Sequence, residues 1–261
     1  MRETGVYLRL ISASLRSQLQ YRASLVMLTL GHLVITASEM VAIWALFARF
    51  GSLRGWRLEE VALCYGLVNV AFAAGEMFGR GFDVFDRLIR SGQFDRYLLR
   101  PRSLAVQVLG LEMRLSRIGR MAQGLAVLAW AMASLPDGPN FWQVLLAGWA
   151  IAGGLALFVG LFAAQATVAF FSPQSLEVAN AFTYGGNEAA QYPMSIYADW
   201  FGKFFTFVIP LACVTYYPAL TILGRTDAIW PWFAPLAGVV FLIGGLAAWQ
   251  WGVRRYRSTG S

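Results

Sequence analysis

The chain has 261 residues, of which 58% are apolar and 13% charged, and it carries a formal net charge of +7. Charged residues supply about a quarter of a soluble domain, so this composition excludes an ordinary soluble protein and indicates an integral membrane protein. Of the 21 basic residues all but Lys203 are arginine, and they lie between long apolar runs. That arrangement favours an anionic phospholipid surface as their partner and argues against nucleic acid.

The N-terminal segment, residues 1–22, is predicted to be an amphipathic helix that lies in the membrane interface. Its apolar residues recur at helical spacing and are Leu8, Ile11, Leu15 and Leu19. Arg9 and Arg16 share another face, which is the pattern of interfacial helices. Residues 1–20 contain no continuous apolar core, so we expect no cleavable signal peptide here. The alternative is a frayed tail.

Six segments are predicted to cross the membrane, because a helix needs about 20 residues to span the hydrocarbon core. They are residues 23–48, 60–79, 118–135, 142–171, 176–194 and 231–253. The fifth is rather polar, and it competes with the more apolar segment 200–223. Seven crossings would place the two basic termini on opposite sides of the membrane. One of these two segments must therefore be re-entrant or lie elsewhere.

The arginines predict the orientation of the chain. Four basic residues precede the first span, nine lie from the end of the second span to the first turn of the third, and three follow the last, so that 16 of the 21 share one side. Because basic residues mark the cytoplasmic side, both termini and the long loop are predicted to be cytoplasmic. The predicted fold is therefore an all-α integral membrane protein with six transmembrane helices.

Ionisable side chains inside the spans are candidates for a functional role, since each costs at least about 2.5 to 3.5 kcal/mol at the membrane centre. His32 and Glu39 are seven residues apart on one face of the first span. A place on a substrate pathway and a hydrogen bond between helices are both open for this pair. Glu76 in the second span can reach Arg80 one turn later, and we expect a structural ion pair near the cytoplasmic interface.

The segment 176–194 carries one polar stripe along a helix face. The stripe comprises Glu177, Asn180, Tyr184, Asn187, Glu188 and Gln191. A helix of this kind places its stripe on a cavity or a subunit interface. The predicted lining of a substrate pathway is Tyr184, Asn187, Glu188, Gln191, Glu39 and His32. A water-exposed amphipathic helix is the alternative, because the periodicity of polar residues does not distinguish a cavity from solvent.

Small residues are expected to mediate helix packing at two places. In the fourth span they recur every four residues, at Gly148, Ala152, Ala156, Gly160 and Ala164. Gly75 and Gly79 repeat this spacing at the end of the second span. Small side chains at such intervals allow a second helix to approach closely.

Sequence motifs for common catalytic and metal centres are absent. The chain contains no G-x-x-x-x-G-K-[ST], H-E-x-x-H, G-x-S-x-G or C-x-x-C motif, so a phosphate-binding loop, a metalloprotease site and a hydrolase triad are not indicated. We therefore expect no ATPase site, no catalytic residue, no metal site and no cofactor in this chain.

The loop 82–103 is the most distinctive stretch of the chain. Its pattern predicts a short amphipathic cytoplasmic helix that breaks at Gly92, restarts near Asp95 and ends at Pro101. The pattern Leu-x-x-x-Gly-x-x-Asp-x-x-Leu-Leu-x-Pro is filled by Leu88, Gly92, Asp95, Leu98, Leu99 and Pro101. In this loop the chain resembles the coupling region of the permease subunits of type-2 ABC exporters, the ABC-2 family.

A second match to the same family lies further along the chain, in residues 191–197, 207–210 and 216–219. These residues look like the end of the fifth span, the extracellular turn and the re-entrant element of that family. The resemblance implies that 176–194 is the fifth span and that 200–223 is an extracellular re-entrant hairpin. Broken backbone at membrane depth is tolerated where protein covers it or where it lines a cavity.

The resemblance also implies a function. Such permeases pair as dimers, with a second copy or a related chain, and dock two ATP-binding subunits that hold ATP and magnesium. The loop from Leu88 to Pro101 is then the contact with the ATP-binding subunit. We expect Asp95 and the neighbouring Arg90, Arg96 and Arg100 to set the docking geometry. The expected cargo is amphipathic or lipid-like and is exported across a bacterial cytoplasmic (inner) membrane.

Three other functions stay open. A proton-coupled secondary transporter would use Glu39, Glu76 and Glu188, but it should show internal repeats, and the two halves of the chain show no convincing one. A lipid-modifying enzyme would need clustered His, Asp or Ser, whereas His32 is the single histidine. A membrane scaffold without cargo is the third.

Overall fold

The structure is a computed structural model that describes residues 3–171 and 176–256. In these residues every regular element is a helix, and the one strand-like pairing is an isolated bridge between Leu53 and Trp56. The predicted all-α class is therefore confirmed.

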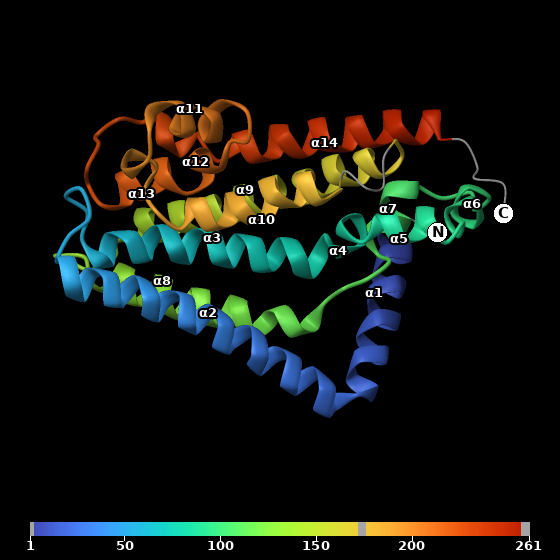
Figure 1. The fold of residues 1–261 in the computed structure, drawn as a ribbon, viewed down its shortest axis with the longest axis horizontal. Coiled ribbons are helices and arrows are strands. Elements are labelled where there is room, and N and C mark those ends of the chain that lie inside the picture. The colour runs from blue at the N-terminus through green and yellow to red at the C-terminus, as the bar shows by residue number, and fades with distance from the viewer. Residues whose placement is uncertain (1–2, 172–175, 257–261) are drawn as a thin grey trace.

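The longer helices of the described chain run side by side as one bundle (Figure 1). They are α2 (Arg22–Phe50), α3 (Leu58–Phe78), α8 (Ile118–Ala133), α9 (Phe141–Ala169), α10 (Leu176–Ala190) and α14 (Leu236–Arg255). One end of the bundle holds α1 (Glu3–Gln20), α4 (Arg80–Asp83), α5 (Phe85–Arg90), α6 (Phe94–Leu98) and α7 (Leu104–Leu109). The other end holds α11 (Asp199–Phe207), α12 (Leu211–Val214) and α13 (Tyr216–Ile222). Short 3-10 turns are η1 (Leu115–Arg117), η3 (Met194–Ile196) and η4 (Trp230–Trp232).

Four helices of the described chain, α2, α3, α9 and α14, are long and apolar enough to cross a membrane. A fifth crossing would count α11 and the helical stretch Leu211–Ile222 as one span, although these two parts are bent by 74°. Helices α8 and α10 have 16 and 15 residues. At 1.5 Å per residue they reach only about 24 and 22 Å. The structure thus gives four to five candidate spans, and the count of six stays a prediction.

Local sequence signals position these helices. A capping box begins α9, where the Gln143 N–H donates to Asn140 Oδ1 and the Asn140 N–H donates to Gln143 Oε1, both at 2.8 Å. α2 ends at Gly51, whose φ of 74° lies in the left-handed region that favours glycine. α3 is apolar around most of its surface, with Asn69 and Glu76 as exceptions, and it is almost wholly buried between α8 and α9. As expected, Gly75 allows Phe158 of α9 to approach it closely.

α2 shows the opposite behaviour and leaves most of its apolar side chains exposed. Met27 is 73% exposed, and Val34 and Val41 are each 60% exposed. A continuous apolar surface of this length is unfavourable in water and suited to lipid. We call it the bare face of α2, and it supports the assignment as an integral membrane protein.

The two ends of the bundle differ in what they carry. The first turn of α1 and the last turn of α14 both lie at the end with α4 to α7, and α11 to α13 lie at the opposite end (Figure 1). α1 crosses its end of the bundle at a steep angle to α2. The apolar face predicted for α1 is described in part, because the side chain of Leu8 lies outside the described residues.

Glycines bring α9 and α14 into close contact. Gly153 and Gly160 face Gly238 and Gly245, and a Cβ on either glycine of α14 would collide with the backbone of α9. Gly160 belongs to the small-residue stripe predicted for this helix. Gly148 does not take part, because nothing lies within 4 Å of its Cβ position. Within the described residues α14 meets the face of α9 that carries Gly153 and Gly160, so the packing role of Gly148 stays a prediction.

We expect Gly245→Leu to lower the melting temperature of the purified chain, because the new side chain must occupy the space of the Gly160 carbonyl group. Overpacking of a tight contact costs typically about 1 to 3 kcal/mol. Gly244→Leu is the matched control, since nothing lies within 4 Å of the Gly244 Cβ position. Equal decreases in the melting temperature of the two variants would contradict this packing.

Candidate functional site

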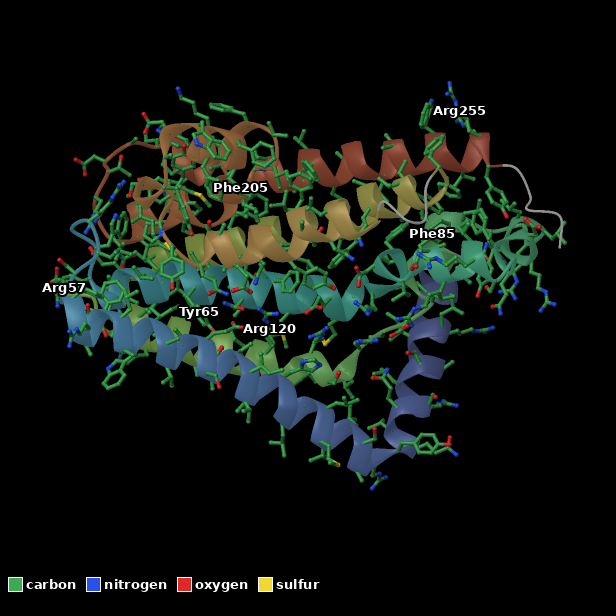
Figure 2. All side chains as sticks on the ribbon, viewed as in Figure 1. Arg57, Tyr65, Phe85, Arg120, Phe205 and Arg255 are labelled. Carbon is green, nitrogen blue, oxygen red and sulfur yellow. The ribbon has the colours of Figure 1, made fainter. Side chains whose placement is uncertain are left out.

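Two arginines at the start of α8 reach into the bundle towards carboxylates of three other helices. The Nη2 atom of Arg117 lies 2.7 Å from Oε1 of Glu76 in α3. The Nη2 atom of Arg120 lies 3.8 Å from carboxylate oxygens of both Glu39 in α2 and Glu188 in α10. Figure 2 shows Arg120 inside the bundle, beside α3. We call these five residues the arginine network.

Side chains of α3 hold Arg120 in place. The Nε–H of Arg120 donates to Oδ1 of Asn69 at 2.9 Å, and its guanidinium lies 4.9 Å from the ring centroid of Phe72. Asn69 is fully buried and Arg120 is 9% exposed. A buried charge without partners costs several kcal/mol, so this arginine depends on the groups around it.

His32 and Glu39, which were predicted to share one face of α2, have different partners. Arg117 Nη1 lies 3.1 Å from Nδ1 of His32, whereas Glu39 meets Arg120. A guanidinium group only donates hydrogen bonds, so Nδ1 of His32 is an acceptor and the ring proton lies on Nε2. Both residues therefore join α2 to the start of α8, and their place on a substrate pathway stays a prediction.

The ion pair predicted between Glu76 and Arg80 is wrong. Glu76 pairs with Arg117, and Arg80 pairs with Asp83 within α4. The physical reason is that α3 ends before Arg80, so Arg80 no longer lies on the helix face that carries Glu76.

A second polar cluster lies where α4, α9 and α10 meet. The hydroxyl of Tyr184 donates to Asp83 Oδ2 at 3.3 Å, and Arg80 pairs with the same carboxylate. Gln165 donates through Nε2 to Asn180 Oδ1 at 2.6 Å and lies 3.5 Å from Asp83 Oδ1. Burial raises the pKa of Asp83, and the charge of Arg80 opposes this shift. The cluster ties α10 to the end of the bundle that carries α4.

The polar stripe of α10 turns mostly inward. Asn187 and Gln191 are buried, and both donate to the Glu188 carboxylate, at 3.3 and 3.0 Å. The side chain of Glu188 itself is 55% exposed. It therefore lies at the edge of the arginine network, where a molecule outside the bundle can reach it. The side chain of Glu177 lies outside the described residues.

The residues predicted for ATPase coupling divide into buried and exposed parts. Leu88 is 5% exposed and belongs to the core, together with residues of α9 and α14. Gly92 forms the turn between α5 and α6, with a φ of 66° in the left-handed region that favours glycine. Leu98 is 41% exposed and Leu99 is 86% exposed.

Leu99 is the most exposed of the large apolar residues that the structure describes. Arg96 and Pro101 beside it are exposed as well, and Asp95 is half-buried. We call Arg96, Leu98, Leu99 and Pro101 the exposed loop tip. Apolar side chains presented in this way mark a surface that another protein or a membrane covers.

The roles of Arg117 and Arg120 were not predicted from the sequence, in which both residues count only towards the basic charge near the long loop. A signal was available for Arg120, because it lies inside the predicted span 118–135, where an arginine requires a partner. Asp83 and Gln165 carried no such signal. In the described part of the chain, no three His, Cys, Asp or Glu side chains gather as a metal site would need.

Long helices with a bare apolar face, joined by ion pairs buried in the bundle, define a multi-pass membrane protein. The sequence model of a family described as ABC-2 family transporter protein matches residues 33–260. The chain belongs to this family and is an ABC transporter permease, which confirms the resemblance seen in the coupling loop. No curated protein and no solved structure matches the chain.

Proposed function

We propose that this chain is the membrane-spanning permease subunit of an ABC exporter that moves an amphipathic or lipid-like substrate with ATP hydrolysed by a separate subunit. The family match over residues 33–260 carries this proposal. The sequence supports a separate ATPase, because it contains no phosphate-binding loop motif. ATP and magnesium are then held by the partner subunit.

The proposed topology has six crossings, made by α2, α3, α8, α9, α10 and α14, with α11 to α13 as an extracellular re-entrant hairpin. An even number of crossings is supported by α1 and α14, whose outer ends lie at the same end of the bundle (Figure 1). Most arginines belong to the segments at this end, which favours the cytoplasmic side of a bacterial inner membrane. The steep angle of α1 to α2 suits a helix that lies in the membrane interface.

The exposed loop tip is the proposed docking surface for the ATP-binding subunit. Leu98 and Leu99 supply apolar area that a partner would bury, and Arg96 and the neighbouring Asp95 supply charges that orient it. Leu88 packs in the core shared with α9 and α14. A displacement of the exposed loop tip would therefore be transmitted to the bundle. Two permeases, identical or related, would present two such tips to two ATP-binding subunits.

Site-specific crosslinking tests this docking surface. A photoreactive amino acid at position Leu99 should crosslink the chain to an ATP-binding subunit in native membranes. Phe207 is the matched control position, because it is 82% exposed but lies in α11 at the opposite end of the bundle. Crosslinks to the ATP-binding subunit from Phe207, or none from Leu99, would contradict the proposal.

Glu188 is the proposed contact between the arginine network and the substrate, because its side chain is 55% exposed beside Arg120. We expect Glu188→Ala to lower transport or cargo-stimulated ATP turnover more than it lowers subunit assembly. Asp137→Ala, in an exposed loop, is the control and should leave both unchanged. Loss of assembly in Glu188→Ala, measured by co-purification, would assign Glu188 a structural role.

A proton-coupled secondary transporter is the second candidate, favoured by the carboxylates Glu39 and Glu76 within the bundle and Glu188 at its edge. Such a carrier needs a proton gradient and no ATP-binding subunit. Uptake driven by a pH gradient into vesicles that contain this chain alone would support it.

A further inference from the structure

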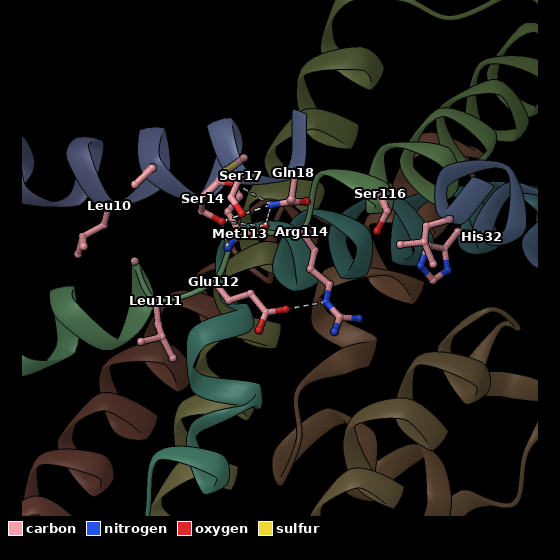
Figure 3. Close-up of a pocket in the computed structure, with 13 residues that line it drawn as sticks. Leu10, Ser14, Ser17, Gln18, His32, Leu111, Glu112, Met113, Arg114 and Ser116 are labelled. Atoms are coloured by element: carbon pink, nitrogen blue, oxygen red, sulfur yellow. Dashed lines mark hydrogen bonds and ion pairs between the residues drawn. The ribbon is translucent and has the colours of Figure 1, made fainter. Parts of the chain in front are cut away.

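A cavity of about 620 Å³ lies between α1, the segment that joins α7 to η1, and the first half of α2 (Figure 3). This volume falls within the range of about 300 to 1,000 Å³ that ligand sites occupy. Helix α1 is fastened over it, because Ser14 Oγ accepts from the Met113 N–H at 3.2 Å and Gln18 Oε1 accepts from the Leu115 N–H at 3.0 Å. Specific hydrogen bonds therefore hold its walls together.

The polar part of the lining offers mainly hydrogen-bond donors. Arg114 uses Nε to donate to Glu112 at 2.8 Å, and its two terminal nitrogens have no hydrogen bond among the described residues. His32 accepts from Arg117 through Nδ1, so its Nε2 carries a proton to donate. Ser17 adds a hydroxyl group. The one carboxylate in the lining, Glu112, is already paired with Arg114. Arg114 and Glu112 balance each other in charge, but the donors that remain on Arg114, His32 and Ser17 favour an anionic ligand.

The other part of the lining is apolar and continues into the bare face of α2. It includes Leu10, Leu28 and Leu111, and Leu28 is 55% exposed. α2 has 29 residues. At 1.5 Å per residue this is about 43 Å, longer than the hydrocarbon core of about 30 Å. The first turns of α2, which carry Leu28, can therefore lie at the depth of lipid headgroups.

We propose that this cavity binds the headgroup of an anionic phospholipid beside Leu28, with the phosphate against Arg114 and His32 and the acyl chains along the bare face of α2 beyond His32. A soluble anion would leave the apolar rim uncovered, and an uncharged apolar molecule would leave the hydrogen-bond donors without acceptors. The proposal rests on the membrane location of the chain and not on its cargo or its ATP-binding subunit. Its failure would leave the proposed transport function unaffected.

Lipid retention by the purified full-length chain tests this site. Native mass spectrometry after exposure to phosphatidylglycerol and phosphatidylcholine vesicles should show preferential retention of phosphatidylglycerol, and this lipid should raise the melting temperature. Arg114→Gln should weaken retention about tenfold, because a charge-assisted contact is lost. Ser17→Trp fills the cavity without removing charge and should have the same effect.

Two variants on the exposed side of α1 serve as matched controls. Arg16→Gln removes the same charge, and Leu19→Trp adds similar bulk, at exposed positions that do not line the cavity. Both should retain phosphatidylglycerol as the unaltered chain does. Equal loss in Arg16→Gln would overturn the proposal, because it would indicate a general attraction of the basic surface to anionic membranes.

Two further results would also overturn it. The first is full retention in Ser17→Trp, which decides the question if Arg114→Gln fails to fold, since Ser17→Trp leaves the pair of Arg114 and Glu112 intact. The second is a thermal shift of the same size from inorganic phosphate alone, which would indicate a site for a free anion.

Discussion

Replacing Gly92 with proline is expected to abolish cargo-stimulated ATP turnover by the assembled transporter, while the chain still inserts into the membrane. Gly92 has a φ of 66°, and proline fixes φ near −65°, so the turn between α5 and α6 cannot keep its shape. The exposed loop tip would then be presented to the ATP-binding subunit in another orientation. The measurement is ATP hydrolysis by the reconstituted complex with and without cargo.

The control for this variant is Gly92→Asn, because asparagine enters the left-handed region more readily than other residues with a side chain. It should retain most of the stimulated turnover. Asp95→Lys is a second test of the same loop, since it reverses a charge beside the tip without altering the turn. Normal turnover in both Gly92→Pro and Asp95→Lys would remove the loop from the coupling pathway.

Removing the Glu76 carboxylate is expected to destabilise the purified chain by about 3 to 5 kcal/mol, which is the usual cost of leaving one partner of a buried ion pair. Glu76 is fully buried, and its pair with Arg117 spans only 2.7 Å. Glu76→Ala therefore leaves a guanidinium group in the bundle whose hydrogen bond among the described residues is the one to His32. Thermal or denaturant unfolding in detergent measures the loss.

Two comparison variants separate burial from charge. Glu59→Ala removes a carboxylate from the exposed pair with Arg57 and should cost no more than about 1 kcal/mol. The double variant Glu76→Leu with Arg117→Leu removes both buried charges and should recover much of the stability lost in Glu76→Ala. If Glu76→Ala costs no more than Glu59→Ala, the buried pair does not stabilise the bundle.

The helical character of the chain was predictable because it follows from local properties. Apolar length alone predicted α2, α3, α9 and α14, and the breaks around Gly92 followed from turn chemistry. The face on which each helix packs was less predictable. The small residues of α9 occur on several faces, and only the position of α14 selects Gly153 and Gly160 over Gly148.

The histidine and the carboxylates of the candidate site were predictable from the sequence, whereas its arginines and the pairing were not. His32 and Glu39 stand out because ionisable groups in spans are costly, and Glu188 stands out because it belongs to the polar stripe of 176–194. Their partners, Arg117 and Arg120, come from a segment that is distant in sequence, so no local spacing reveals the contacts. The error at Glu76 has the same origin, because a partner one turn away was preferred to one from another helix.

Purification of the tagged chain from its native host in a mild detergent, with mass spectrometry of the proteins that co-elute, tests most directly whether it is a permease driven by a separate ATPase. The proposed function predicts an ATP-binding subunit in the eluate, with a second related permease if the transporter is a heterodimer. A chain that reproducibly elutes alone, under conditions that preserve other membrane complexes, would contradict it. Glu39, Glu76 and Glu188 would then be the candidate proton-binding groups of a proton-coupled carrier.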